Sequence, residues 1–284
     1  MTNMNNVLNT DLSGKVAVIT GAGGVLCSRM AMVLARAGAK TALISRSMGP
    51  IARLADEINQ DGGISRAYQS NVLDKLGMEA VAARIQADLG PCDILINGAG
   101  GNDVRATTDH EYYLPDDLHG DTKSFFDLDG DSIDAVFSLN FKGALISTQV
   151  FAKQMLGRGG NIINISSMNA YRPLTKIPAY SGAKAAVSNF TQWLAVYFSR
   201  AGIRVNAIAP GFFSGKQNAR LLWNEDGSPT ERTKKILTAT PLERFGTSEE
   251  LDGSLLFLVN DEAAGFITGV VLPVDGGFSA YSGV

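Results

Sequence analysis

The sequence is poor in cysteine and in histidine. Two cysteines, Cys27 and Cys92, and two histidines, His110 and His119, are all that 284 residues contain. Their spacing matches none of the close pairs that bind zinc, and two thiols allow at most one disulfide. These counts argue against a disulfide scaffold, and we expect no metal site.

Long hydrophobic runs and an excess of positive charge are missing as well. No apolar run approaches the roughly 18–20 residues that cross a bilayer, and the first residues lack the basic flank and apolar core of a signal peptide. Lys and Arg number 25 against 28 Asp and Glu, so the basic surface that nucleic acids select is absent. With 45% hydrophobic residues, the composition is that of a packed globular protein. We expect a cytoplasmic protein that binds small molecules and neither nucleic acid nor membrane.

Short apolar runs alternate along the chain with longer amphipathic stretches. The first run, 15–20, is apolar almost throughout, as a strand buried on both faces must be, and helical spacing follows from Met30 to Ala37. Strands are predicted at residues 15–20, 41–45, 64–70, 93–96, 160–165, 203–209 and 270–274. This alternation predicts an α/β fold, a doubly wound parallel sheet of the Rossmann type in one domain.

Two irregular regions interrupt the alternation. Residues 101–130 are polar and acidic, and residues 212–240 contain predicted short helices around 221–223 and 235–237. Both follow strands directly, so we expect both at the carboxyl edge of the sheet, where open parallel sheets bind ligands. The first is predicted to be an insertion that walls the substrate pocket, and the second to be a substrate loop.

A glycine-rich turn joins the first predicted strand to the first helix. Its glycines, Gly21, Gly23 and Gly24, allow a sharp bend and the close approach of a pyrophosphate to the helix N-terminus. Such a turn alone is weak support, because many turns of this kind merely connect two elements. Its place after the first buried strand favours a dinucleotide site, which includes Val25 and Leu26.

The second predicted strand ends in Ser45 and Arg46, with no carboxylate nearby. A carboxylate at this point selects NAD through the ribose 2′-hydroxyl, whereas an arginine accommodates the 2′-phosphate of NADP. We therefore predict NADP as the cofactor, with NAD as the alternative. In the alternative interpretation, Arg46 is a solvated surface side chain that does not contact the cofactor.

Tyr180 and Lys184 are four residues apart and share one face of a predicted helix. An unperturbed phenol has a pKa of about 10, and a neighbouring ammonium, or a cationic nicotinamide ring, is expected to lower it. Ser166 and Ser167 end the preceding strand, where a hydroxyl can hold a substrate oxygen. A tyrosine and a lysine at this spacing are most often structural, but the serine pair and the glycine turn together favour an acid–base site.

In combination, these motifs resemble the short-chain dehydrogenase/reductase family over nearly the whole chain. The family's Tyr-x-x-x-Lys matches Tyr180 and Lys184, and its catalytic serine matches Ser167. Its Asn-Asn-Ala-Gly motif matches residues 97–100, with Gly98 in place of one asparagine. Its helix asparagine, its Pro-Gly pair and its late Asp-Gly-Gly match Asn140, Pro210-Gly211 and Asp275-Gly276-Gly277.

The resemblance implies a role for each matched residue. Tyr180 would be the general acid/base, and Lys184 would lower its pKa and bond the nicotinamide ribose. Ser167 would orient the carbonyl, while Asn140 would hold a water that relays protons to Lys184. Further cofactor contacts are implied at Asn71, Val72, Asn97, Ala99, Gly100, Pro210, Gly211 and Phe213.

The chain departs from the family pattern at several positions. Val25 and Cys27 stand where the first motif has glycines, so the conformation of the pyrophosphate turn is an open question. Asn71 stands where an aspartate that binds adenine is common, and its amide offers similar hydrogen bonds. Gly215 replaces a threonine that often follows the Pro-Gly pair.

Several phrases, and the tail, are similar to the bacterial D-mannonate oxidoreductases of this family, also called fructuronate reductases. They comprise residues 125–129, 167–170, 173–178, 210–213, 216–218 and 278–284. The similarity implies interconversion of D-mannonate and D-fructuronate. The alternative functions are those of a gluconate 5-dehydrogenase, a 3-oxoacyl reductase and a non-catalytic dinucleotide-binding protein.

A sugar acid needs a cation for its carboxylate and polar groups for its hydroxyls. The candidate cations are Arg105, Arg172, Lys176 and Lys216, and the candidate hydroxyl partners are Asn169, Gln217 and Asn218. Of these, Asn169 and Lys216 are predicted to contact the substrate together with Ser167 and Tyr180. The resemblance also implies a homotetramer, for which apolar residues between Val187 and Tyr197 suit an interface or a core equally.

Overall fold

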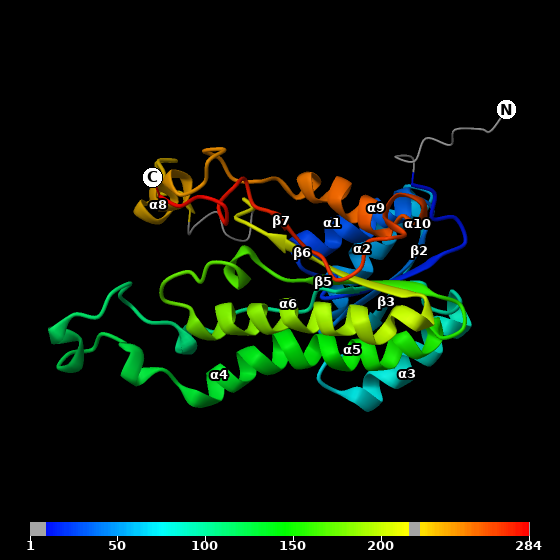
Figure 1. The fold of residues 1–284 in the computed structure, drawn as a ribbon, viewed down its shortest axis with the longest axis horizontal. Helices are drawn as coiled ribbons and strands as arrows, with labels where there is room; N and C mark the ends of the chain where they lie inside the picture. Colours follow the sequence, from blue (N-terminus) through cyan, green and yellow to red (C-terminus); the bar gives the residue numbers. More distant parts are fainter. Residues whose placement is uncertain (1–9, 216–221, 284) are drawn as a thin grey trace.

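The computed structural model describes residues 10–215 and 222–283 (Figure 1). Its centre is a parallel sheet of seven strands in the order β3-β2-β1-β4-β5-β6-β7. The strands are β1 (Val16–Thr20), β2 (Lys40–Ser45), β3 (Ile64–Gln69), β4 (Ile94–Asn97), β5 (Gly160–Ile165), β6 (Ile203–Pro210) and β7 (Val271–Val274). Each predicted strand is confirmed to within one residue at either end, and the doubly wound α/β fold is confirmed with them.

Helices cover both faces of the sheet (Figure 1). They are α1 (Val25–Arg36), α2 (Met48–Gln60), α3 (Lys75–Asp88), α4 (Gly130–Phe137), α5 (Gly143–Phe151), α6 (Pro178–Phe198), α8 (Glu231–Thr238), α9 (Asp252–Val259) and α10 (Asp261–Ala264). Side chains of α1, α2 and α9 form one hydrophobic core, and those of α3, α5 and α6 form the other. No helix in residues 10–215 and 222–283 is long and apolar enough to span a bilayer.

Each strand divides its side chains between the two cores. In β1, Ala17 and Ile19 pack with α1 and α2, whereas Val16 and Val18 pack with α3 and α5. This explains the unbroken apolar run, because consecutive residues of a strand point to opposite faces and both faces are covered. Since the chain runs outward from β1 on one side and from β4 on the other, the carboxyl ends of these two strands form the crevice in which such sheets bind ligands.

The predicted insertion is an extended arm, residues 101–130, that projects beyond the carboxyl edge of the sheet (Figure 1). It contains only short turns, η1 (Val104–Ala106), η2 (Pro115–Leu118) and η3 (Phe125–Asp127). The predicted helix at 235–237 lies within α8. Of the one predicted at 221–223, residue 221 falls outside the described residues, and Trp223 forms an isolated β-bridge with Pro229. The region from 222 to 240 lies across from the arm (Figure 1).

Candidate active site

A cavity of about 500 Å³ opens at the carboxyl edge of β1, β2, β4, β5 and β6. Fourteen of the predicted site residues line it: Gly21, Gly24, Val25, Leu26, Ser45, Arg46, Val72, Ala99, Gly100, Ser167, Tyr180, Lys184, Pro210 and Gly211. One cavity therefore joins the predicted nucleotide turn to the predicted acid–base pair.

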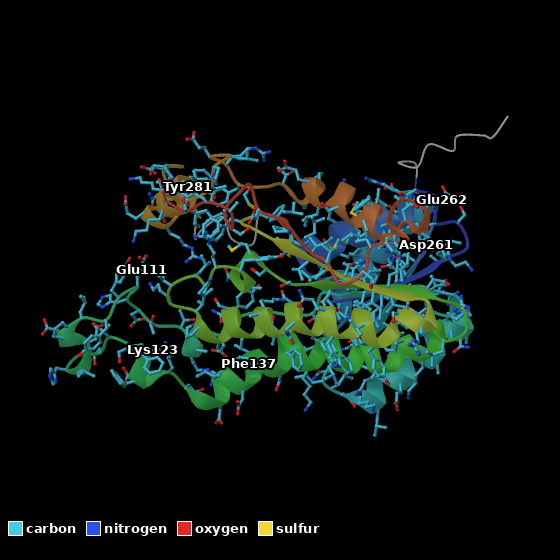
Figure 2. The ribbon with its side chains drawn as sticks, in the orientation of Figure 1. Glu111, Lys123, Phe137, Asp261, Glu262 and Tyr281 are labelled. Carbon is cyan, nitrogen blue, oxygen red and sulfur yellow. The ribbon has the colours of Figure 1, made fainter. Side chains whose placement is uncertain are left out.

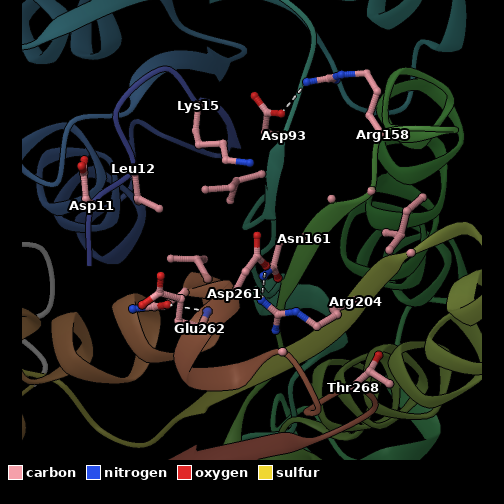
Figure 3. Close-up of a pocket in the computed structure, with 18 of the residues that line it drawn as sticks. Asp11, Leu12, Lys15, Asp93, Arg158, Asn161, Arg204, Asp261, Glu262 and Thr268 are labelled. Carbon is pink, nitrogen blue, oxygen red and sulfur yellow. Dashed lines mark hydrogen bonds and ion pairs between the residues drawn. The ribbon is translucent and has the colours of Figure 1, made fainter. Parts of the chain in front are cut away.

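A larger cavity, of about 870 Å³, lies at the opposite edge of the sheet (Figure 3). Its arginines are paired with acids: Arg158 with Asp93 at 2.6 Å and Arg204 with Asp261 at 2.9 Å. None of the predicted catalytic side chains lines it. We therefore place the candidate active site in the smaller cavity.

The turn after β1 is built for the close approach of a ligand. Gly21 has φ +67°, and a Cβ there would lie 2.7 Å from the carbonyl oxygen of Gly98, so only glycine fits. Helix α1 begins at Val25, and its N-cap, Gly24, supplies no side-chain hydrogen bond. The first turn of α1 thus lacks a side-chain cap where the cavity begins, which fits the pyrophosphate of a dinucleotide.

Tyr180 and Lys184 lie one turn apart on α6, and the Lys184 Nζ is 5.6 Å from the centroid of the Tyr180 ring. The Lys184 ammonium donates to the carbonyl oxygen of Ile165 at 2.8 Å. Burial lowers the pKa of Lys184 to about 8 from its usual 10.5. The lysine is therefore held at the end of β5 and is still mostly charged at neutral pH.

The prediction that Lys184 lowers the pKa of Tyr180 does not hold for the protein by itself. Burial raises the pKa of the Tyr180 phenol, while its hydrogen bond with Ser167 acts in the opposite direction. The reason is the position of the ammonium, which bonds Ile165 and faces the ring, so that loss of hydration dominates. Tyr180 is thus protonated near neutral pH and is ready to donate a proton.

Asn140 lies in a π-helical turn, η4 (Ser138–Lys142), between α4 and α5. Its Nδ2 donates to the carbonyl oxygens of Gly101 at 2.7 Å and Val136 at 2.8 Å, and its Oδ1 accepts from the Gly101 amide at 3.2 Å. A Cβ on Gly100 would lie 2.5 Å from that Oδ1 and 3.1 Å from Lys184 Nζ. The side chain therefore fixes the loop after β4 against Lys184 instead of lining the cavity.

Four further predicted cofactor contacts lie outside the cavity lining. Asn97 is buried, and its Nδ2 donates to Thr148 at 2.9 Å and to Asn164 at 2.8 Å, so it ties β4 to its neighbours. The Asn71 side chain accepts from the amide of Leu73. The two remaining residues are Gly23, near Ser45, and Phe213, which packs against the core on the α1 side.

The predicted substrate groups are similarly divided. Asn169 is buried beside Ser167, and its Oδ1 has no hydrogen-bond partner among the described residues. Lys216, Gln217 and Asn218 lie outside the described residues. The Ser166 hydroxyl faces α6, where it donates to the carbonyl oxygen of Lys184 at 3.2 Å. Of the two serines, Ser167 is therefore the one that meets the phenol.

Sequence reasoning missed other residues of the lining. They are Cys27, Ile44, Ser70, Gly98, Gly101, Leu139 and Ile165, whereas Ser166, which also lines the cavity, was predicted together with Ser167. Most of these residues are next to a predicted contact in the sequence. Their position at the end of a strand is therefore the signal by which they could have been predicted. Burial raises the pKa of the Cys27 thiol to about 11, with the Lys184 charge acting against it.

Comparison with known proteins decides the family. The family described as short chain dehydrogenase matches residues 15–225. The chain belongs to this family. The dehydrogenase is 59% identical over 282 residues to an uncharacterized oxidoreductase of Haemophilus influenzae, with 99% of each chain covered.

Two solved structures are similar to the dehydrogenase. A Haemophilus structure with bound NAD, provisionally named D-mannonate oxidoreductase, superimposes with a TM-score of 0.94 at 59% identity, covering 99% of this chain and 100% of the other. A gluconate 5-dehydrogenase of Burkholderia cenocepacia, in complex with NADP and tartrate, superimposes with a TM-score of 0.81 at 28% identity. The match covers 98% of this chain and 100% of the other. The dehydrogenase is an NAD(P)-dependent oxidoreductase that acts on alcohol groups.

Proposed function

We propose that the dehydrogenase interconverts D-mannonate and D-fructuronate. The bound nicotinamide would supply or accept the hydride at the carbon that carries the reacting oxygen. The observation that carries the proposal is the meeting of Tyr180, Ser167 and Lys184 in one cavity with the nucleotide turn. The Haemophilus structure, at 59% identity, supports the choice of sugar acid.

Each catalytic side chain has a task in this proposal. The Tyr180 phenol, protonated because burial raises its pKa, donates a proton to the substrate oxygen during reduction and takes it back during oxidation. The Ser167 hydroxyl holds that oxygen beside the phenol. The Lys184 ammonium binds the nicotinamide ribose, and Asn140 fixes the loop that contains Gly100 and Gly101.

The direct test is the oxidation of NADPH or NADH by the purified protein with D-fructuronate, 5-ketogluconate or a 3-oxoacyl thioester. We expect kcat/KM to be highest with D-fructuronate. A higher kcat/KM with either of the other two compounds would refute the substrate while leaving the chemistry in place. No turnover with any of them, together with nucleotide binding, would favour a non-catalytic binding protein.

Gluconate 5-dehydrogenase is the second candidate. The Burkholderia enzyme, a gluconate 5-dehydrogenase in complex with NADP and tartrate on the same fold, supports it. Only the substrate pocket would differ, because the acid–base residues serve both reactions. The comparison of D-fructuronate with 5-ketogluconate separates the two.

For the cofactor we propose NADP, on the strength of Arg46 at the end of the cavity. NAD is the alternative, and the NAD bound to the Haemophilus structure supports it. The Arg46 carbonyl accepts from Gln69 at 2.9 Å, which fixes its backbone beside the expected ribose. An Arg46→Ala variant should lower kcat/KM for NADPH about tenfold and leave that for NADH unchanged. A wild-type preference for NADH would overturn this assignment.

We further propose a homotetramer of cytoplasmic location, in which residues 1–284 act as one domain. Val187 and Leu194 are buried in the core, but Trp193 and Tyr197 are 56% and 66% exposed on α6 and stack at 4.9 Å. Exposed aromatics of this kind suit a subunit interface. Light scattering of the wild type and of Trp193→Ser tests it, with a smaller mass expected for the variant.

A further inference from the structure

The arm, residues 101–130, is held at its base and on one side. At the base, Ala106 is fully buried in a small hydrophobic cluster with Ala179 and Ala183 of α6. Glu111 lies on the side of the arm that faces α8 (Figure 2), and its Oε1 accepts from Lys235 Nζ at 2.8 Å. These contacts fix the arm to the molecule but leave the rest of its surface open.

The outer arm has large apolar side chains and no apolar core. Within residues 107–130, all of which the structure describes, the buried residues are the polar Asp117 and Ser124. Phe125 and Phe126 are each 69% exposed, with ring centroids 5.6 Å apart, and the Tyr113 ring lies 6.4 Å from that of Phe126. The exposed large apolar residues of the arm are Val104, Tyr112, Tyr113, Leu114, Leu118, Phe125 and Phe126.

This apolar surface is as large as one side of a stable protein interface. Each aromatic side chain has about 150–250 Å² of surface, and the seven residues are exposed by half to more than three-quarters, so the arm presents roughly 800 Å². One partner of a standard interface also buries about 800 Å². An exposed apolar surface of this size is typical of a site that another molecule covers.

A second aromatic cluster lies at the other end of the same helical layer. The rings of Phe190, Trp193 and Tyr197 stack along α6, with successive centroids 6.3 and 4.9 Å apart, and Val196 is exposed beside them. These residues belong to the C-terminal half of α6, whereas the arm extends beyond the N-terminal end of the helix (Figure 1). The layer of α4, α5 and α6 therefore has aromatic surface at each end.

Charge is divided between the same two ends. The arm contains eight acidic and two basic residues, a net charge of −6 (2 − 8). Beyond it, no Asp or Glu occurs between Asp134 and Glu225, and the residues that follow α5 and α6 include Lys153, Arg158 and Arg200. One end of the layer is therefore acidic and the other end is basic.

Charges at both ends have no partner within the described part of the chain. Arg200, in η7 (Ser199–Ala201) directly after α6, forms no ion pair there, and neither do Asp116 and Asp121 of the arm. The 21 residues of α6, about 31 Å at 1.5 Å per residue, separate the two ends. The acidic arm and the basic end therefore do not meet within one molecule.

We propose that the arm of one copy of this chain packs on the C-terminal end of α6 in a second copy. A two-fold axis across the middle of α6 makes the two helices antiparallel, so that each arm lies at Tyr197 and Arg200 of the other copy. Aromatic surface then meets aromatic surface, and the acidic arm meets the basic end, twice in each pair. The inference rests on the proposed subunit contact at α6 and adds the arm as the element that covers it.

Crosslinking between copies tests the contact directly. The variant Phe126→Cys/Tyr197→Cys, treated with a bismaleimide, should give a covalent dimer on a denaturing gel. Cys27 and Cys92 are buried and should not react. The two single variants are the matched controls, because the two-fold axis places equivalent positions of the two copies at opposite ends of the contact. No dimer in the double variant, or as much in the single variants, would overturn the inference.

Charge reversal tests the electrostatic part of the contact. Asp121→Lys and Arg200→Glu should each raise the dissociation constant of the assembly about tenfold or more, because like charges then face each other. The combined variant should recover most of this loss. Sedimentation velocity over a concentration series measures all three, and an absence of recovery would contradict the pairing of the arm with the end of α6.

Arg53→Glu is the matched control for charge reversal. Arg53 is exposed on α2, on the opposite face of the sheet, and forms no ion pair among the described residues. Its reversal makes the same change in net charge as that of Arg200, yet the variant should assemble as the wild type does. Equal weakening by both reversals would show an effect of net charge and overturn the inference.

A failure of this inference can be told apart from a failure of the proposed tetramer. Phe125→Ser/Phe126→Ser changes exposed side chains, so its Tm should match that of the wild type while its mass in light scattering falls. Dissociation by Trp193→Ser but not by this arm variant would preserve the α6 interface and overturn the role of the arm. A wild type that is monomeric would overturn both.

Discussion

The thiol of Cys27 occupies the space that a side chain at position 98 would need. A Cβ built on Gly98 would lie 2.1 Å from Cys27 Sγ and 3.0 Å from the carbonyl oxygen of Thr20. Cys27 stands where the family has glycine, and Gly98 stands where it has asparagine. These two departures lie 71 positions apart along the sequence (98 − 27) but compensate each other in volume. The larger residue at position 27 fills the space that the smaller residue at position 98 leaves.

Substituting Gly98→Asn should destabilise the protein, because the new side chain overlaps the thiol. Overpacking of this kind costs about 1–3 kcal/mol in the free energy of unfolding. The amides of Gly98 and Ala99, which bond the Thr20 hydroxyl at 3.1 and 3.3 Å, should also shift and weaken cofactor binding. Chemical denaturation and cofactor titration measure the two effects.

The double variant Cys27→Gly/Gly98→Asn should recover most of this loss. Cys27→Gly alone leaves a small cavity and should be mildly destabilised, so the two changes should be strongly non-additive. Simple additivity in the double-mutant cycle would contradict this compensation.

The fold was predictable from the sequence for a physical reason. Strands buried on both faces, such as Val16–Thr20, must be apolar throughout. The apolar composition of a short segment therefore indicates where such a strand begins and ends. The order of motifs then placed Tyr180 and Lys184 at the edge where the nucleotide turn lies. The first inference depends on local sequence alone, whereas the second depends on the combination of motifs along the chain.

The remaining features depend on three-dimensional packing, which a local pattern does not contain. Asn97 was predicted to face the cofactor, but the pleat of β4 directs its amide to Thr148 and Asn164. The pKa of Tyr180 follows from its burial, which the spacing to Lys184 does not reveal. The link between Glu111 and Lys235 spans 124 residues.

Replacing Tyr180 by phenylalanine should remove the proton donor and keep the ring. We expect kcat to fall by about 10²–10⁴ or more, because general acid catalysis is lost, while the dissociation constant of the cofactor changes little. Stopped-flow single turnover and fluorescence titration measure the two quantities. Retained turnover would mean that another donor of the same lining, the Lys184 ammonium or the Ser167 hydroxyl, delivers the proton.

Gly100 and Gly101 offer a matched pair for the loop after β4. Gly100→Ala would place a Cβ 2.5 Å from Asn140 Oδ1 and 3.1 Å from Lys184 Nζ, so we expect weaker cofactor binding and a loss of kcat of tenfold or more. Gly101→Ala meets only Leu139, at the ordinary distance of 3.8 Å, and should behave as the wild type. Similar kinetics for the two variants would show that the loop tolerates displacement.

Cofactor affinity should depend on pH through Lys184. In the free protein the pKa of Lys184 is lowered from 10.5 to about 8, so the ammonium is present below that pH and is lost as the pH rises through it. An anionic dinucleotide binds the charged form better, which should keep its dissociation constant flat below about pH 8 and raise it by up to about tenfold per pH unit above. Burial raises the pKa of Cys27 to about 11, so the thiol stays protonated in this window.

The Lys184→Met variant is the control for this pH dependence. It should bind the cofactor more weakly at neutral pH and with a dissociation constant that no longer changes between about pH 7 and 9.5. Isothermal titration calorimetry across that range, at constant ionic strength, measures both profiles. Parallel profiles, or a wild-type break only near the ordinary lysine pKa, would show that the buried ammonium does not control binding. A flat variant and a wild type that breaks near pH 8 would locate the charge that holds the ribose end of the cofactor at Lys184.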